Sequence, residues 1–267
     1  MVHLALQIRL VQFQRMTHRP IVLVTGASKG IGAATALAFA EAGYDVCVNY
    51  HRDAAGAAET AARCEASGAK VLVSCANVAD RAAVSDMLDA CDDALGPIAC
   101  LVNNAGIIGG AAAVTDISEE ALHATFATNV FGALYCLQEA ARRMRTDRGG
   151  AGGAIVNMSS VAATMGSPGE YVHYASSKGA VETLTIGAGK ELGPFGIRVT
   201  AIRVGTTNTG LHAREGNAAR PASIAAATPL GRIAEPVDIA EAAVWLASPK
   251  ANFVSGTVLT VAGGLLA

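Results

Sequence analysis

Short apolar runs alternate along this chain with longer segments of helical spacing, and this alternation restricts the fold more than any other feature. The first run, 21–24, is continuously apolar, as expected for a strand covered on both faces. Further strand-like runs lie at 45–50, 69–75, 98–103, 154–159, 196–202 and 257–261. The first helical segment follows the first run and ends near residue 42. The others span roughly 53–67, 80–95, 118–147, 172–193 and 236–247. This order predicts a doubly wound α/β fold, with a seven-stranded parallel sheet and helices on both faces.

The length and composition suit a single globular unit. Of the 267 residues, 52% are hydrophobic and 16% charged, so the chain can bury a large core. We find no internal repeat and no linker rich in proline or serine, and we expect one domain over 20–267 after an extension over 1–19. The extension alternates like a strand from Leu4 to Leu10 and lacks the pattern of a secretory signal. Because Met16 directly precedes the first organised segment, we interpret 1–15 as an upstream addition without a chemical role.

Charge, hydropathy and cysteine usage exclude several classes of function. A formal net charge of −2 gives no electrostatic footprint for nucleic acid, and no apolar run is long enough for a membrane span. The six cysteines form no C-x-x-C pair and have no histidine spacing suited to zinc, so we expect no metal site. Cys47, Cys75 and Cys100 lie in strand-like runs, where we expect small buried hydrophobes. This usage suits a reducing, cytoplasmic compartment.

A glycine-rich turn follows the first apolar run. Gly26, Gly30 and Gly32 have the spacing G-x-x-x-G-x-G between a predicted strand and a predicted helix. Glycines at this place permit a tight turn and let the backbone approach a pyrophosphate, which then lies on the helix N-terminus. The alternative is a turn that needs glycine only for positive φ.

Two asparagine-containing segments follow. In 103–106, Asn103-Asn104-Ala105-Gly106, the small residues leave room for a ribose or adenine next to the fourth predicted strand. Asn129 lies inside the predicted 118–147 helix, although asparagine is a mediocre helix former. This amide among apolar residues indicates a local kink or a bound water; a solvent-facing side chain is the alternative.

Tyr174 and Lys178 are four residues apart at the start of the predicted 172–193 helix, so they share one face. An ammonium beside a phenol favours the phenolate and lowers the phenol's pKa, which makes Tyr174 a candidate general acid/base. Upstream, Ser160 follows an apolar run and can hydrogen-bond a substrate oxygen. Ser159 would point to the opposite side of its strand. The alternative is an exposed Tyr and Lys on an amphipathic helix.

In this order and spacing, the motifs resemble the short-chain dehydrogenase/reductase family. They are T-G-x-x-x-G-I-G at 25–32, N-N-A-G at 103–106, Asn129, the Ser160…Tyr174-x-x-x-Lys178 set and G-R-I-A-E-P at 231–236. The segments 50–52 and 166–172 are similar to those of proteins akin to glucose 1-dehydrogenase and 3-oxoacyl-(acyl-carrier-protein) reductase. The resemblance implies a Rossmann fold, binding of a nicotinamide cofactor, and a tetramer built partly on the 118–147 and 172–193 helices.

The resemblance also implies residue roles. Tyr174 would be the acid/base, Lys178 would lower its pKa and hold the nicotinamide ribose, Ser160 would position the substrate oxygen, and Asn129 would hold a water linking Lys178 to solvent. The substrate would be a small carbonyl or alcohol compound. Tyr174 and Lys178 would also contact the cofactor, together with Gly26, Ser28, Lys29, Gly30, Ile31, Gly32, Tyr50, His51, Arg52, Asn77, Val78, Asn104, Ala105, Gly106, Gly205, Thr207 and Thr209.

One segment departs from the family pattern. Val204 replaces the usual proline after the sixth strand, and Thr207 stands where an aliphatic residue is common, while Gly205 and Thr209 are retained. We therefore expect a less rigid cofactor loop. The following segment, 206–232, is expected to form a lid.

The second strand predicts the cofactor preference. NAD-selective sites usually place an acid near the end of this strand, but here 49–52 reads Asn-Tyr-His-Arg, and Asp53 is expected to cap the next helix. Arg52 and Lys29 can approach a 2′-phosphate. We therefore expect NADP(H) to be preferred and NAD(H) to be possible. The alternative function is a dinucleotide-binding sensor or scaffold without catalysis, for which a proton-transferring set would be superfluous.

Overall fold

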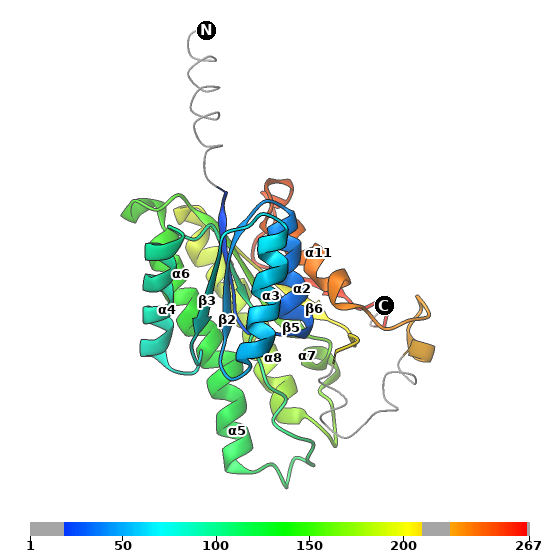
Figure 1. Ribbon diagram of the computed structural model, residues 1–267. Coiled ribbons are helices and arrows are strands. Elements are labelled where there is room, and N and C mark those ends of the chain that lie inside the picture. The colour runs from blue at the N-terminus through cyan, green and yellow to red at the C-terminus, as the bar shows by residue number, and fades with distance from the viewer. Residues whose placement is uncertain (1–18, 210–224, 266–267) are drawn as a thin grey trace, which may run out of the picture.

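The computed structural model describes residues 19–209 and 225–265, which contain one seven-stranded parallel sheet with helices on both faces (Figure 1). The strand order is β3-β2-β1-β4-β5-β6-β7. The strands are β1 (Ile21–Val24), β2 (Asp45–Tyr50), β3 (Val71–Cys75), β4 (Cys100–Asn103), β5 (Gly153–Ser160), β6 (Ile197–Val204) and β7 (Thr257–Val261). The order reverses between β1 and β4, where doubly wound sheets bind ligands. The predicted fold class is confirmed.

Two helical layers bury the sheet. One contains α2 (Gly30–Glu41), α3 (Ala54–Ala66) and α11 (Pro236–Ala247), and the other contains α4 (Arg81–Ala94), α6 (Ala133–Met144) and α8 (Val172–Leu192) (Figure 1). Side chains of β1 alternate between the two cores: Ile21 and Leu23 pack toward α4, α6 and α8, while Val22 and Val24 pack toward α2, α3 and α11. This burial on both faces explains why the strand is apolar without alternation.

The predicted 118–147 helix is interrupted. The structure has α5 (Glu119–Phe126), a π-helical turn η2 (Ala127–Gly132), α6 and a short 3₁₀ turn η3 (Thr146–Arg148). The irregularity expected at Asn129 is therefore present, as a π-helical turn between α5 and α6. Gly132 allows the π-helical turn to pack closely, because a Cβ there would lie 2.8 Å from Val78 Cγ2.

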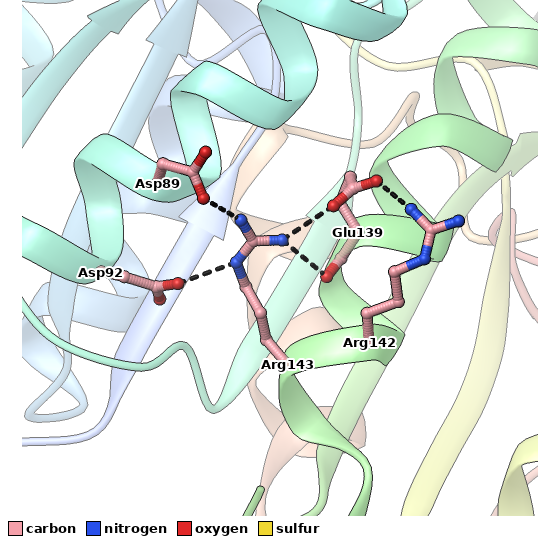
Figure 2. Close-up of polar contacts among 5 residues, drawn as sticks. All are labelled: Asp89, Asp92, Glu139, Arg142 and Arg143. Atoms are coloured by element: carbon pink, nitrogen blue, oxygen red, sulfur yellow. Dashed lines mark hydrogen bonds and ion pairs between the residues drawn. The ribbon is translucent and has the colours of Figure 1, made fainter. Parts of the chain in front are cut away.

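Arg143 ties α6 to α4. Figure 2 shows its guanidinium between Asp89 and Asp92 of α4 and Glu139 of its own helix. Its Nε donates to Asp92 Oδ2 at 2.7 Å, and Nη1 donates to Glu139 Oε2 at 2.9 Å. Arg142 also pairs with Glu139. Because Arg143 is largely buried, this network is held more firmly than a lone surface pair.

Two sequence expectations need correction. Cys47 and Cys100 are buried, but Cys75 is exposed because it ends β3 at the edge of the sheet. Arg19, assigned above to the extension, is joined to the domain by hydrogen bonds to the carbonyl oxygens of Ala40 at 2.6 Å and Gly68 at 2.8 Å. The rest of the predicted extension lies outside the described residues.

Within 19–209 and 225–265, no helix is long and apolar enough to cross a membrane. The same residues contain no cluster of three His, Cys, Asp or Glu side chains that could hold a metal ion.

Candidate active site

The glycine-rich turn joins β1 to α2 with very close backbone packing. Gly26 and Gly30 have φ of 63° and 56°, in the left-handed region that favours glycine. A Cβ on Gly32 would lie 2.3 Å from the carbonyl oxygen of Gly26, so no side chain fits there. Lys29, the N-cap residue of α2, makes no side-chain hydrogen bond to the helix. The first N–H groups of α2 are therefore not capped by that residue, which suits an anion such as a pyrophosphate.

Side chains from two neighbouring strands hold this turn. Asn104 donates its amide to the carbonyl oxygens of Thr25 at 2.9 Å and Gly26 at 3.0 Å. Thr25 Oγ1 accepts from the backbone N–H groups of Asn104 and Ala105. Asn49, buried at the end of β2, accepts from the Gly26 N–H at 3.1 Å. Asn104 thus braces the turn. Asn49 was missed as a site residue, and the signal was its polar amide inside a buried strand.

The segment after β2 forms the charged end of the site. Tyr50 is half-buried, while His51 and Arg52 are exposed. Among the described residues Arg52 has no ion-pair partner, whereas Lys29 Nζ lies 3.1 Å from Asp53 Oδ2. Asp53 Oδ1 accepts from the Gly56 N–H at 3.1 Å, which confirms the predicted cap of α3.

The segment after β3 contains the predicted cofactor residues Asn77 and Val78. Asn77 Oδ1 accepts from the backbone N–H of Ala79 at 3.1 Å. Val78 is buried and packs against Gly132. Val78, Thr25 and Ala105 line one narrow gap that is too small for a water molecule, so the segment after β3 lies against the start of the glycine-rich turn.

Tyr174 and Lys178 lie in the first two turns of α8. Tyr174 is half-buried, and Lys178 is 6% exposed. Lys178 Nζ lies 5.7 Å from the centroid of the Tyr174 ring and donates to the carbonyl oxygen of Met158 at 2.8 Å. The predicted shared face is present, and the alternative of an exposed Lys is wrong.

The two serines at the end of β5 point in different directions, as expected. Ser160 Oγ accepts from the Ala162 N–H at 3.2 Å and is close enough to the Tyr174 hydroxyl to influence its pKa. Ser159 Oγ instead donates to Glu182 Oε1 at 2.8 Å. Ser160 is therefore the serine beside Tyr174, while Ser159 joins β5 to α8.

The electrostatics of the pair differ from the prediction. Burial raises the pKa of Tyr174 above its ordinary value, and the neighbouring Ser160 hydroxyl lowers it by less. Burial lowers the pKa of Lys178 from 10.5 to about 8. The expected downward shift of the Tyr174 pKa by Lys178 is thus absent here, because burial dominates and Lys178 Nζ is directed to the Met158 carbonyl.

Asn129 points inward from η2. It is 2% exposed, so the solvent-facing alternative is wrong. Its Oδ1 accepts from the Ile107 N–H at 2.8 Å, and its Nδ2 donates to the Ile107 carbonyl at 2.8 Å and to Ser177 Oγ at 3.0 Å. A Cβ on Gly106 would lie 3.2 Å from Asn129 Oδ1 and 3.5 Å from Lys178 Nζ. Gly106 therefore lies between Asn129 and Lys178. Ser177, which accepts a hydrogen bond from Asn129, is a further residue of the site that the sequence did not indicate.

The 204–209 segment is tied down at its start. Gly205 packs on β7, since a Cβ there would lie 2.7 Å from Ala262 Cα. Thr207 is buried and donates to the Gly205 carbonyl oxygen at 3.0 Å. Thr209 reaches the glycine-rich turn, where a Cβ on Gly30 would lie 3.3 Å from Thr209 Cγ2. Most of the predicted lid, residues 210–224, lies outside the described residues.

Parallel sheets of this strand order, with a glycine-lined turn after β1, characterise dinucleotide-dependent oxidoreductases. Comparison with known proteins identifies the family within this class. The family described as enoyl-(acyl carrier protein) reductase matches residues 26–266. The chain belongs to the short-chain dehydrogenase/reductase family, whose enzymes are oxidoreductases that act on alcohol and ketone groups.

Relatives cover nearly the whole chain. It is 44% identical to the uncharacterized oxidoreductase YgfF of Escherichia coli (strain K12), over 91% of this chain and 99% of the relative. It is 37% identical to an L-rhamnose 1-dehydrogenase (NAD(P)(+)) of Sphingomonas sp. (strain SKA58), over 91% and 95%.

Solved structures of the family superpose closely. A 7α-hydroxysteroid dehydrogenase complexed with NADH and 7-oxo glycochenodeoxycholic acid has a TM-score of 0.86 at 31% identity, covering 92% of this chain and 94% of its own. A short-chain dehydrogenase from Burkholderia cenocepacia J2315 in complex with NADP has a TM-score of 0.85 at 32% identity, covering 94% and 98%.

Proposed function

We propose that this chain is an NADP(H)-dependent oxidoreductase that interconverts a carbonyl compound and a secondary alcohol, with Tyr174 as the acid/base. The observation that carries the proposal is the grouping of Tyr174, Ser160 and Lys178 beyond the carboxyl ends of the strands, next to the glycine-rich turn. A bound nicotinamide would supply or accept the hydride at C4.

The chain's own residues would handle the proton and the substrate oxygen. In reduction, the Tyr174 hydroxyl gives its proton to the carbonyl oxygen, and in oxidation the phenolate takes it back. Ser160 Oγ hydrogen-bonds the same oxygen and holds it near Tyr174. The Lys178 ammonium, 5.7 Å from the centroid of the Tyr174 ring, would hold the nicotinamide ribose beside Tyr174. The second lone pair of Asn129 Oδ1, beside Gly106, would hold a water between Lys178 and solvent.

The test is turnover, followed by cofactor absorbance, with a panel of aldoses, 3-oxoacyl thioesters and cyclic ketones. Turnover of at least one class supports the proposal. Cofactor binding without turnover of any of them would instead favour the non-catalytic sensor or scaffold.

The charged end of the site supports a preference for NADP(H). Lys29 and the exposed Arg52 flank the place where a 2′-phosphate would lie, and the end of β2 has Tyr50 where an NAD-selective site has a carboxylate. The relative named for NAD(P)(+) and the solved neighbours with NADP and NADH support use of both cofactors within this family. We therefore propose NADP(H) as the preferred cofactor and NAD(H) as a usable one.

Arg52→Ala should lower kcat/KM for NADP(H) roughly 10- to 100-fold and leave that for NAD(H) almost unchanged, because a hydrogen bond to a charged group contributes about 1.5–3 kcal/mol. Steady-state kinetics with both cofactors measure the ratio of kcat/KM for NADP(H) to kcat/KM for NAD(H). Arg63→Ala, an exposed arginine in the last turn of α3, is the matched control. A parent enzyme that favours NAD(H), or a ratio unaffected by Arg52→Ala, would contradict the proposed preference.

We also propose a homotetramer built partly on the α5–α6 region and α8. Leu122, Phe131 and Ile186 of these elements are exposed. A Cβ built on Gly179 or Gly187 would meet no heavy atom within 4 Å from the other described elements, so both glycines leave space for a partner helix. Ala133 and Ala188, two further small residues of these helices, are buried within the chain and cannot contact a partner.

Light scattering should give the mass of four chains, and Ile186→Asp should shift it to smaller species by placing a charge in an apolar contact. Val73→Asp, at an equally exposed position of the edge strand β3, should leave the mass unchanged. A monomeric parent at working concentration would contradict the proposed assembly.

The proposed location is the cytoplasm. The six free cysteines of the described chain support a reducing compartment.

A further inference from the structure

The Asp53 carboxylate contacts both Lys29 of the glycine-rich turn and the first turn of α3. Its Oδ2 lies 3.1 Å from Lys29 Nζ, and its Oδ1 caps α3 by accepting from the Gly56 N–H at 3.1 Å. One carboxylate thus joins the glycine-rich turn to the helix that follows β2.

Backbone packing fixes this carboxylate independently of the flexible lysine. A Cβ on Gly56 would lie 2.4 Å from the carbonyl oxygen of Ser28 and 3.0 Å from Asp53 Oδ2. The first turn of α3 therefore packs directly against the glycine-rich turn, and only glycine at position 56 permits this approach. The Asp53 carboxylate lies beside residues 28 and 29 whatever rotamer Lys29 adopts.

The charge of Asp53 opposes the binding of a phosphate in the same region. Lys29 is the basic group of the glycine-rich turn, and its ammonium is already paired with this carboxylate. A 2′-phosphate carries close to two negative charges and would lose part of the attraction of Lys29 to Asp53, while Asp53 itself repels it. A 2′-hydroxyl, as in NAD(H), carries no charge and experiences neither effect.

We propose that Asp53 limits the selectivity of this enzyme for NADP(H) by holding Lys29 and repelling the 2′-phosphate, so that NAD(H) remains usable. This inference rests on the proposed function, because it takes the region around Lys29 and Arg52 as the 2′-phosphate site. Asp53 is therefore a specificity determinant that contacts the phosphate-binding lysine.

Asp53→Asn tests the proposal, because asparagine caps helices as well as aspartate does and removes only the charge. We expect kcat/KM for NADP(H) to rise about threefold to tenfold, as for removal of an opposing charge at a partly exposed site, while that for NAD(H) stays within about twofold. The melting temperature should stay at the parent value. Glu59→Gln, which removes an exposed carboxylate from the second turn of α3, should leave both cofactors unchanged.

Titration calorimetry with 2′,5′-ADP and 5′-ADP gives a readout without turnover. Asp53→Asn should increase the binding affinity for 2′,5′-ADP and leave the affinity for 5′-ADP unchanged. The increase should be smaller when the substitution is made together with Lys29→Met. A gain of equal size in that background would contradict the role of Lys29. An unchanged affinity for 2′,5′-ADP, or a gain matched by Glu59→Gln, would overturn the proposal. If the parent favours NAD(H), the proposed cofactor preference fails, but the response of 2′,5′-ADP to Asp53→Asn still decides this inference.

Discussion

Tyr174→Phe is expected to lower kcat roughly 10²- to 10⁴-fold, the range that general acid–base catalysis contributes, with little change in stability or cofactor affinity. The substitution removes one hydroxyl and keeps the ring packed at the start of α8. The lost group is the hydroxyl whose pKa Ser160 influences, and no other described phenol is grouped with Ser160 and Lys178. The proton to the substrate oxygen would then have to come from water.

Steady-state kinetics on a substrate from the panel measure the loss, and calorimetry with NADPH and thermal melting show that binding and fold persist. Tyr135→Phe is the matched control, because Tyr135 is a half-buried tyrosine of α6 below Arg81. Near-parent activity in Tyr174→Phe would show that Tyr174 is not the acid/base.

Lys178→Met is expected to lower kcat/KM roughly 10²- to 10³-fold, as when a preorganised electrostatic group is removed from an active site. It should also change how stability depends on pH. Burial lowers the pKa of Lys178 from 10.5 to about 8, a difference that corresponds to roughly 3 kcal/mol. The folded chain bears this cost while Lys178 is charged.

The direction follows from proton binding. Below pH 8 the lysine is charged in both the folded and unfolded states, so the full cost is present. Between pH 8 and 10.5 the unfolded chain binds more protons, and the parent gains stability as pH rises. Methionine has no such cost, but it leaves the Met158 carbonyl without its hydrogen bond.

The measurement is the free energy of urea unfolding for parent and variant between pH 7 and 10. The parent should gain most of roughly 3 kcal/mol relative to Lys178→Met over this range. Lys190→Met, an exposed lysine near the end of the same helix, should show no such difference. A pH-independent difference between parent and Lys178→Met would contradict the lowered pKa of Lys178.

Local patterns predicted the parts of the fold that depend on near neighbours. The apolar run of β1 predicted a strand buried on both faces, and Val22 and Leu23 do pack on opposite sides. The four-residue spacing of Tyr174 and Lys178 predicted their shared face on α8. The position of Asp53 directly before a helical segment predicted its cap.

The site's fine structure depends on contacts between distant segments, and spacing alone did not provide it. The sequence indicated an irregularity at Asn129, but only the packed chain shows the amide buried against Ile107 and Ser177. Cys75 has the same strand-like surroundings as Cys47, yet it is exposed because β3 lies at the edge of the sheet.

The sequence by itself determined the order of the elements, the glycine-rich turn and the Tyr–Lys face, because these follow from periodicity and backbone freedom within a few residues. Only the tertiary structure decided the balance of charges in the site. Burial raises the pKa of Tyr174 and lowers that of Lys178, and the close packing of Gly56 on Ser28 places Asp53 beside Lys29. Desolvation and ion pairing depend on which distant groups the fold brings together, and neither is encoded in local spacing.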